Sequence, residues 1–143
     1  MKISNYTLLN LINTLGVYED RKMPQRISYA ITRTMMNLSD EYRFYDKQLK
    51  KLLQTYDDYL VKDKDGNMTF DEHGVPIVTD EKRREFNGQV ADLLNCEVDV
   101  DIYHIPFDTF DYENNDIFDA LSPNDIMTLQ SILCERKTPE KEG

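Results

Sequence analysis

The sequence predicts one domain of the α+β class, mainly α, in which a long helix packs with shorter helices. A small β-hairpin and one edge-type strand complete the predicted architecture. Three observations support it: apolar residues at heptad spacing within residues 25–58, two turn signals within residues 60–78, and strict polar–apolar alternation over residues 97–102. With 143 residues, of which 40% are hydrophobic, the chain has the size for a single modest core.

The long helix is predicted from a seam of apolar side chains separated alternately by four and three residues. The seam consists of Ile31, Met35, Leu38, Tyr42, Tyr45, Leu49, Leu52 and Tyr56. Because no Gly or Pro interrupts this stretch, we expect one helix over about residues 25–58. Its seam must be covered by another helix of the same chain or by a second copy, and the sequence leaves both open.

Three shorter helices follow from capping signals next to apolar periodicity. Ser4 or Asn5 caps a first helix that ends near Gly16, and Thr79 or Asp80 opens another that carries Phe86 and Val90. The run Ser122-Pro123-Asn124-Asp125 combines an N-cap, a first-turn proline and an acidic third residue, which predicts a last helix.

The remaining segments are predicted from turns and alternation. Asp65-Gly66-Asn67 and His73-Gly74 predict a hairpin excursion over about residues 60–78. In the strand, Val98, Val100 and Ile102 should face the core. We expect the domain to cover residues 1–136, an acidic strand and irregular loop to cover residues 97–119, and residues 137–143 to form a disordered tail. No internal repeat is apparent.

The acidic and basic residues are separated along the chain. The chain has 27 acidic and 17 basic residues and a formal net charge of −10, which argues against direct binding to nucleic acid or to an anionic membrane. Between Glu85 and Glu135 there is no Lys or Arg but 12 acidic residues, whereas residues 21–51 carry a net positive charge. The start has no secretory h-region and no apolar run is long enough to span a bilayer, so we expect an intracellular protein.

Two interpretations of the acidic segment stay open. The carboxylates either solubilise the protein and partly neutralise its own basic helix, or they present an anionic surface to the basic groove of a partner protein. On a strand, carboxylates on alternate residues repeat every ~6.6 to 6.8 Å, a length comparable with the spacing of phosphates on a nucleic-acid strand. The candidate partner-binding residues are Glu97, Asp99, Asp101, Asp108, Asp111, Glu113, Asp116 and Asp119, with Tyr103 and Tyr112 as aromatic anchors.

The motifs of catalysis are missing from the sequence, so we expect no enzyme, no catalytic residue, no cofactor and no metal. There is no P-loop, no dinucleotide-binding glycine motif and no nucleophile elbow. Asp63-x-Asp65-Gly66 places its glycine at the fourth position, whereas an EF-hand loop requires it at the sixth. Glu97, Asp99 and Asp101 are better explained as solvated carboxylates than as metal ligands.

Three stretches resemble a family of short, uncharacterised phage and prophage proteins of Gram-positive bacteria. They are Lys2-Ile3-Ser4-Asn5-Tyr6, Leu93-Leu94-Asn95-Cys96-Glu97-Val98-Asp99-Val100-Asp101-Ile102, and Leu121-Ser122-Pro123. The resemblance covers nearly the whole chain, and because the family has no assigned function it implies an origin without a site to transfer.

A phage origin implies a protein of the host cytoplasm that antagonises a host defence protein, such as a CRISPR nuclease, without catalysis. The expected mode is direct contact through the acidic, nucleic-acid-mimicking surface, with no direct contact to nucleic acid or membrane. The alternative is a structural, assembly or coiled-coil adaptor protein of the phage that forms a homodimer through its long helix.

Overall fold

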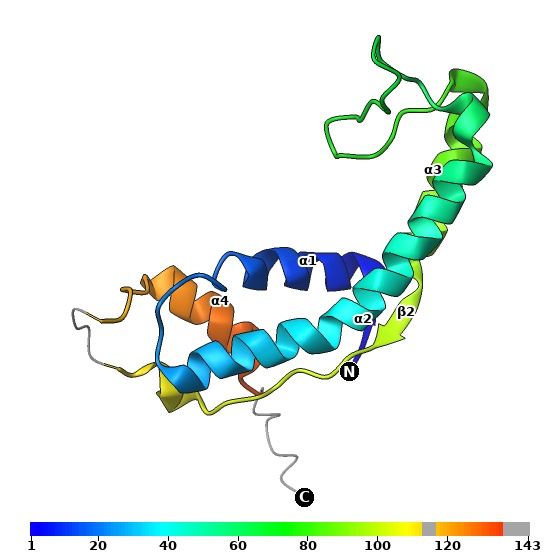
Figure 1. The fold of residues 1–143 in the computed structure, drawn as a ribbon. Helices are drawn as coiled ribbons and strands as arrows, with labels where there is room; N and C mark the ends of the chain where they lie inside the picture. The colour runs from blue at the N-terminus through cyan, green and yellow to red at the C-terminus, as the bar shows by residue number, and fades with distance from the viewer. Residues whose placement is uncertain (113–116, 136–143) are drawn as a thin grey trace, which may run out of the picture.

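The computed structural model describes residues 1–112 and 117–135, and it confirms the predicted mainly helical α+β class (Figure 1). The elements are β1 (Lys2–Ser4), α1 (Asn5–Gly16), α2 (Gln25–Thr55), α3 (Asp80–Asn95), β2 (Glu97–Asp99) and α4 (Pro123–Leu133), with 3₁₀ turns η1 (Asp57–Tyr59) and η2 (Phe107–Phe110). The predicted end of the domain at residue 136 and the predicted disordered tail lie outside the described residues.

The helices are arranged as a body and an arm, which share α2 (Figure 1). In the body, α1, α4 and the N-terminal half of α2 surround a core that includes Leu8, Leu15, Ile27, Ile31, Leu38, Val100, Leu129 and Leu133. In the arm, α3 runs beside the C-terminal half of α2 and a smaller core contains Tyr56, Val78, Phe86 and Val90. The arm therefore depends on few buried side chains of its own.

The seam of the long helix is largely covered within one chain. Ile31 and Leu38 are buried in the core of the body, Tyr45 is buried farther along the helix, and Tyr56 is buried in the arm. The helix ends at Thr55, a few residues before the expected end near residue 58. It ends there because Tyr56 packs its ring against Phe86, at 5.2 Å between centroids, and the chain leaves through η1 toward the tip of the arm.

The predicted strand is shorter than residues 97–102. β2 stops at Asp99 because its antiparallel partner β1 has only three residues, with Lys2 opposite Asp99 and Ser4 opposite Glu97. Beyond the ladder, the chain stays extended and the alternation continues. Val98, Val100 and Ile102 pack against the core of the body as predicted, while the acidic residues between them are exposed. The partner strand β1 was not predicted, because three residues carry no periodic signal.

Asn5 joins the start of α1 to the end of α3. Ser4 caps α1 by accepting a hydrogen bond from the amide of Thr7, which places Asn5 in the first turn. Asn5 is only 3% exposed; its amide donates to the carbonyl of Cys96 and its Nδ2 to the carbonyl of Leu93, both at 2.9 Å. One residue near the N-terminus thus satisfies two carbonyl oxygens at the C-terminal end of a distant helix.

The hairpin excursion is a compact double turn at the end of the arm, and we call residues 60–78 the tip. Three isolated antiparallel bridges hold it, between Leu60 and Val78, Lys62 and Met68, and Phe70 and Pro76. The amide of Val61 donates to the carbonyl of Ile77, the amide of Ile77 to that of Thr69, and the amide of Thr69 to that of Val61, at 2.9, 2.9 and 3.1 Å. These hydrogen bonds close a ring, so the tip is ordered without a regular sheet.

The turns of the tip form a repeat of eight residues, although no internal repeat was predicted from the sequence. Asp63 Oδ1 accepts two backbone N–H groups of the first turn, and Asp71 Oδ1 accepts two of the second. Gly66 and Gly74 close these turns with φ of +80° and +76°, a conformation that favours glycine. The two Asp-x-x-Gly stretches at the same spacing were the available signal.

A capping box and one carboxylate attach α4 to the body. Ser122 accepts from the amide of Asp125, and Asp125 accepts from the amide of Ser122. Asp125 also accepts from the Tyr18 hydroxyl at 2.9 Å and from the Arg21 guanidinium at 3.1 Å. Asp125 therefore links the α4 N-terminus to the segment that joins α1 to α2.

We expect Asp125→Asn to reduce the acid sensitivity of the fold. The hydrogen bond from the Ser122 amide, together with those from Tyr18 and Arg21, lowers the pKa of Asp125 from 3.8 to about 2. A lowered folded-state pKa adds stability that is present above pH 3.8 and is lost as the pH falls through about 2. Denaturant unfolding measured between these pH values should show that the variant loses less free energy of unfolding than the wild type as the pH falls. An equal loss in both proteins would contradict the role of Asp125 in acid sensitivity.

Candidate functional site

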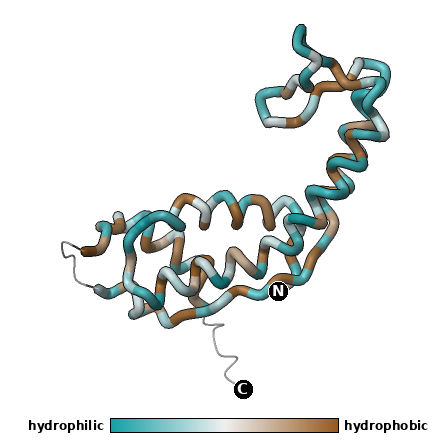
Figure 2. The backbone as a smooth tube through the Cα atoms, viewed as in Figure 1, coloured by the Kyte–Doolittle hydropathy of each residue, from teal (hydrophilic) through white to brown (hydrophobic). Residues whose placement is uncertain are grey.

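The acidic segment predicted from the sequence forms an extended strap along the body, and we call residues 97–111 the acidic strap. It runs from β2 along α2 to η2 (Figure 1), and its hydropathy alternates in Figure 2. The Tyr103 amide donates to Thr34 Oγ1 at 3.0 Å, Asn37 Nδ2 donates to the Asp101 carbonyl at 3.2 Å, and the Ile105 amide donates to the Leu133 carbonyl at 2.9 Å. Because Thr34 is fully buried, the middle of the strap is anchored to a rigid helix.

The carboxylates of the strap lie at its two ends. Glu97, Asp99 and Asp101 are exposed near β2, and Asp108 and Asp111 are exposed at η2. The intervening residues span up to about 20 Å at the rise of an extended chain. The strap therefore presents two anionic groups with a neutral stretch between them.

The cations of α2 do not neutralise these carboxylates by direct pairing. Within the described residues, no Lys or Arg side chain forms an ion pair with Glu97, Asp101, Asp108 or Asp111. Asp99 lies 2.9 Å from the N-terminal ammonium of Met1, and the hydrogen bond from this group lowers the pKa of Asp99. On α2, Arg43 and Lys50 pair with acidic residues of the same helix.

Asp119 and Tyr112 lie apart from this arrangement. Asp119 pairs with the connector between α1 and α2: its amide donates to the Lys22 carbonyl at 2.7 Å and its carboxylate accepts from the Lys22 amide at 2.8 Å. The Tyr112 hydroxyl donates to the Asp119 carbonyl, and its ring packs against Phe118. Burial and the Asp119 charge raise the pKa of Tyr112. Asp119 and Tyr112 thus contact Lys22, each other and Phe118, and the predicted site residues Glu113 and Asp116 lie outside the described residues.

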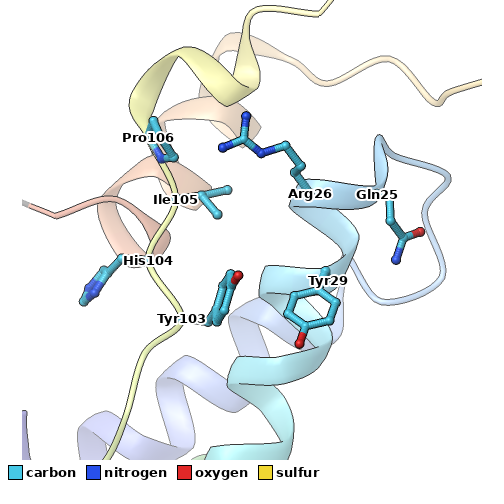
Figure 3. A pocket seen from close by; sticks show the side chains of 7 residues that line it. All are labelled: Gln25, Arg26, Tyr29, Tyr103, His104, Ile105 and Pro106. Carbon is cyan, nitrogen blue, oxygen red and sulfur yellow. The ribbon is translucent and has the colours of Figure 1, made fainter.

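The neutral middle of the strap is aromatic and borders a cavity. Tyr103 meets Tyr29 of α2 edge to face, with ring centroids 5.1 Å apart, and both rings are nearly half exposed. They line a cavity of about 310 Å³ together with Gln25, Arg26, His104, Ile105 and Pro106 (Figure 3). Tyr103 is among the residues predicted from the sequence, whereas Tyr29 and Arg26 are not, because nothing in the sequence indicates which turn of the helix the strap crosses.

A second hollow lies on the other side of the strap. The His104 ring points away from the two tyrosines (Figure 3), and its Nδ1 lies 3.8 Å from Glu135 Oε1. Phe107, which is half exposed, and Asp108 border the same hollow. The strap thus has aromatic rings on both of its sides, and carboxylates border the second hollow.

The described part of the chain has neither a metal-ligand cluster nor a membrane-spanning helix. Among residues 1–112 and 117–135, no three His, Cys, Asp or Glu side chains gather as metal ligands would. None of the helices in these ranges combines the length and the apolar character needed to cross a bilayer. Comparisons with protein-family models, with curated proteins and with solved structures find no match for this chain.

Proposed function

We propose that this chain is a non-enzymatic binding protein whose acidic strap contacts a basic groove of a partner protein. The observation that carries the proposal is the row of exposed carboxylates on alternate residues of an extended, anchored segment, Glu97, Asp99 and Asp101. Since the described cations of the chain leave Glu97 and Asp101 unpaired, these charges are available to another molecule.

The distribution of side chains along the strap fits a protein interface better than a purely electrostatic surface. Exposed carboxylates accelerate encounter with a basic partner, but they add little affinity at physiological salt. Tyr29, Tyr103 and Phe107 supply exposed aromatic area between the two anionic groups. Aromatic anchors within a polar rim are the common arrangement of binding hot spots.

The partner class that we propose is a host defence protein with a basic nucleic-acid channel, such as a CRISPR nuclease. This choice derives from the resemblance to phage and prophage proteins, and it places the contact in the host cytoplasm. The alternating carboxylates at one end of the strap, Glu97, Asp99 and Asp101, would then occupy the channel as a nucleic-acid mimic.

Affinity capture from infected Gram-positive cells, eluted with rising salt, supplies a partner for a direct titration. We expect the double variant Glu97→Lys/Asp101→Lys to weaken binding to the purified partner by roughly tenfold or more at low salt, and by less at high salt. A duplex DNA that fills the channel should compete with the wild-type chain.

The matched control is Glu19→Lys/Asp20→Lys, which makes the same change in net charge on two exposed residues of the α1–α2 connector. It should bind nearly as the wild type does. Equal losses in the two double variants would mean that only net charge matters, and no loss in the strap variant would remove the strap from the interface.

A further inference from the structure

The tip is more elaborate than the connection of two helices requires. Antiparallel helices are commonly joined by about 2–8 residues, whereas residues 56–79 join α2 to α3. Long ordered connections in small domains usually carry a function. A ring of backbone hydrogen bonds and two Asp-anchored turns keep this one in a single conformation.

The tip exposes an aromatic side chain next to a carboxylate. Phe70 is 54% exposed although the Phe70–Pro76 bridge fixes its backbone. Asp71 follows, but its Oδ1 is occupied by the amides of His73 and Val75. Glu72 provides the more accessible carboxylate, because its side chain is 85% exposed; its Oε1 lies 3.4 Å from Nε2 of His73, which is itself exposed.

The cavity beside the strap has the complementary chemistry. Its walls include the rings of Tyr29 and Tyr103 and the apolar side chains of Ile105 and Pro106, and its volume of about 310 Å³ is large enough for a phenyl ring. The Arg26 side chain extends along the same cavity (Figure 3). Among the described residues, no side chain or carbonyl forms a hydrogen bond or an ion pair with its guanidinium.

The two features lie at opposite ends of one helix. The cavity lies beside Gln25, Arg26 and Tyr29 in the first turns of α2, and the tip follows its C-terminal end, about 46 Å away at 1.5 Å per residue over 31 residues. A chain cannot place its own tip in its own cavity. Two copies with antiparallel α2 helices would bring each tip to the cavity of the other.

We propose that two copies of this chain associate reciprocally, with Phe70 of each copy in the Tyr29–Tyr103 cavity of the other and Glu72 paired with Arg26. In this twofold arrangement, each tip occupies the cavity of the other copy. No tip or cavity is left to bind a third chain, so the assembly stops at a dimer. It uses neither the heptad seam nor the carboxylates of the strap, so it does not rest on the proposed function. Because it covers Tyr103, the monomer is the form that exposes the whole strap.

Sedimentation equilibrium of the full chain over a wide concentration range tests the proposal without any partner. The wild type should pass from monomer to dimer, and Phe70→Ala should raise the dimer Kd roughly a hundredfold, because it removes an aromatic anchor from both contacts. The control Phe44→Ala changes an aromatic residue of α2 that is 60% exposed, and it should leave Kd unchanged. Circular dichroism confirms that both variants are folded.

Exchange of the two charges identifies the contact. Arg26→Glu or Glu72→Lys alone should weaken the dimer, and the double variant should restore it, since the pair is re-formed with opposite sign. An equimolar mixture of Phe70→Ala and Arg26→Glu chains should show intermediate association, because one of its two contacts stays intact. A wild type that is monomeric at every concentration, or a dimer insensitive to Phe70→Ala and to the charge exchange, overturns the proposal.

Discussion

Asn5→Asp is expected to lower the free energy of unfolding by about 3 kcal/mol. The substitution replaces Nδ2, which donates to the Leu93 carbonyl, by an oxygen that faces the same carbonyl at a site only 3% exposed. It buries a carboxylate at the C-terminal end of α3, where the unpaired carbonyls already carry negative partial charge. An acidic residue in the first turn of α1 gains at most about 1 kcal/mol from the dipole of that helix, so the loss prevails.

The control is Asn13→Asp, the same chemical change at an exposed position of α1. It should alter the stability by less than about 0.5 kcal/mol. Denaturant unfolding of the wild type and the two variants measures these differences. A similar free energy of unfolding for both variants would mean that the hydrogen bond between Asn5 and α3 contributes little to stability.

Phe86→Ala should cost about 3–5 kcal/mol, and the loss should be confined to the arm. Phe86 is fully buried, and it contacts Tyr56 at the centre of a core that has few other members. The remaining side chains cannot fill the volume of a phenyl ring, so the tip and the adjoining parts of α3 and α2 should open locally. The core of the body shares no buried residue with this cluster.

Hydrogen exchange measured by mass spectrometry distinguishes local from global opening. Peptides from the tip and α3 should exchange much faster in Phe86→Ala, while peptides from α1 and α4 keep their protection. Phe44→Ala is the control, because Phe44 is 60% exposed on α2. Uniform acceleration over the whole chain would show that body and arm unfold as one unit.

The strap shows which structural features the alternation of polar and apolar residues predicts and which it does not. The alternation of residues 97–102 correctly predicted which side chains enter the core and which stay exposed, since an extended chain places successive side chains on opposite sides. It did not predict that the ladder ends at Asp99, because that depends on the length of β1, almost one hundred residues away. A local pattern carries no information about the partner of a strand.

In the candidate site, too, some features follow from local sequence patterns and others only from tertiary contacts. The described strap carboxylates are exposed, as the alternation predicts, whereas Asp119 contacts Lys22 and Tyr112 packs against Phe118, contacts that the sequence does not predict. Tyr29 and Arg26 belong to the site only because the strap crosses α2 beside them. The tip was predicted as a hairpin, yet its closed ring depends on hydrogen bonds among three segments.

The sequence by itself determined the helices, their caps, the turns and the exposed carboxylates, because each of these depends on neighbours a few residues apart. The tertiary structure alone decided which residues share a surface. It divided the core between a body and an arm, joined Asn5 to α3, and placed the Tyr29–Tyr103 cavity and Phe70 at opposite ends of α2. These arrangements arise from packing between distant segments, whose free energy depends on contacts that no short stretch of sequence specifies.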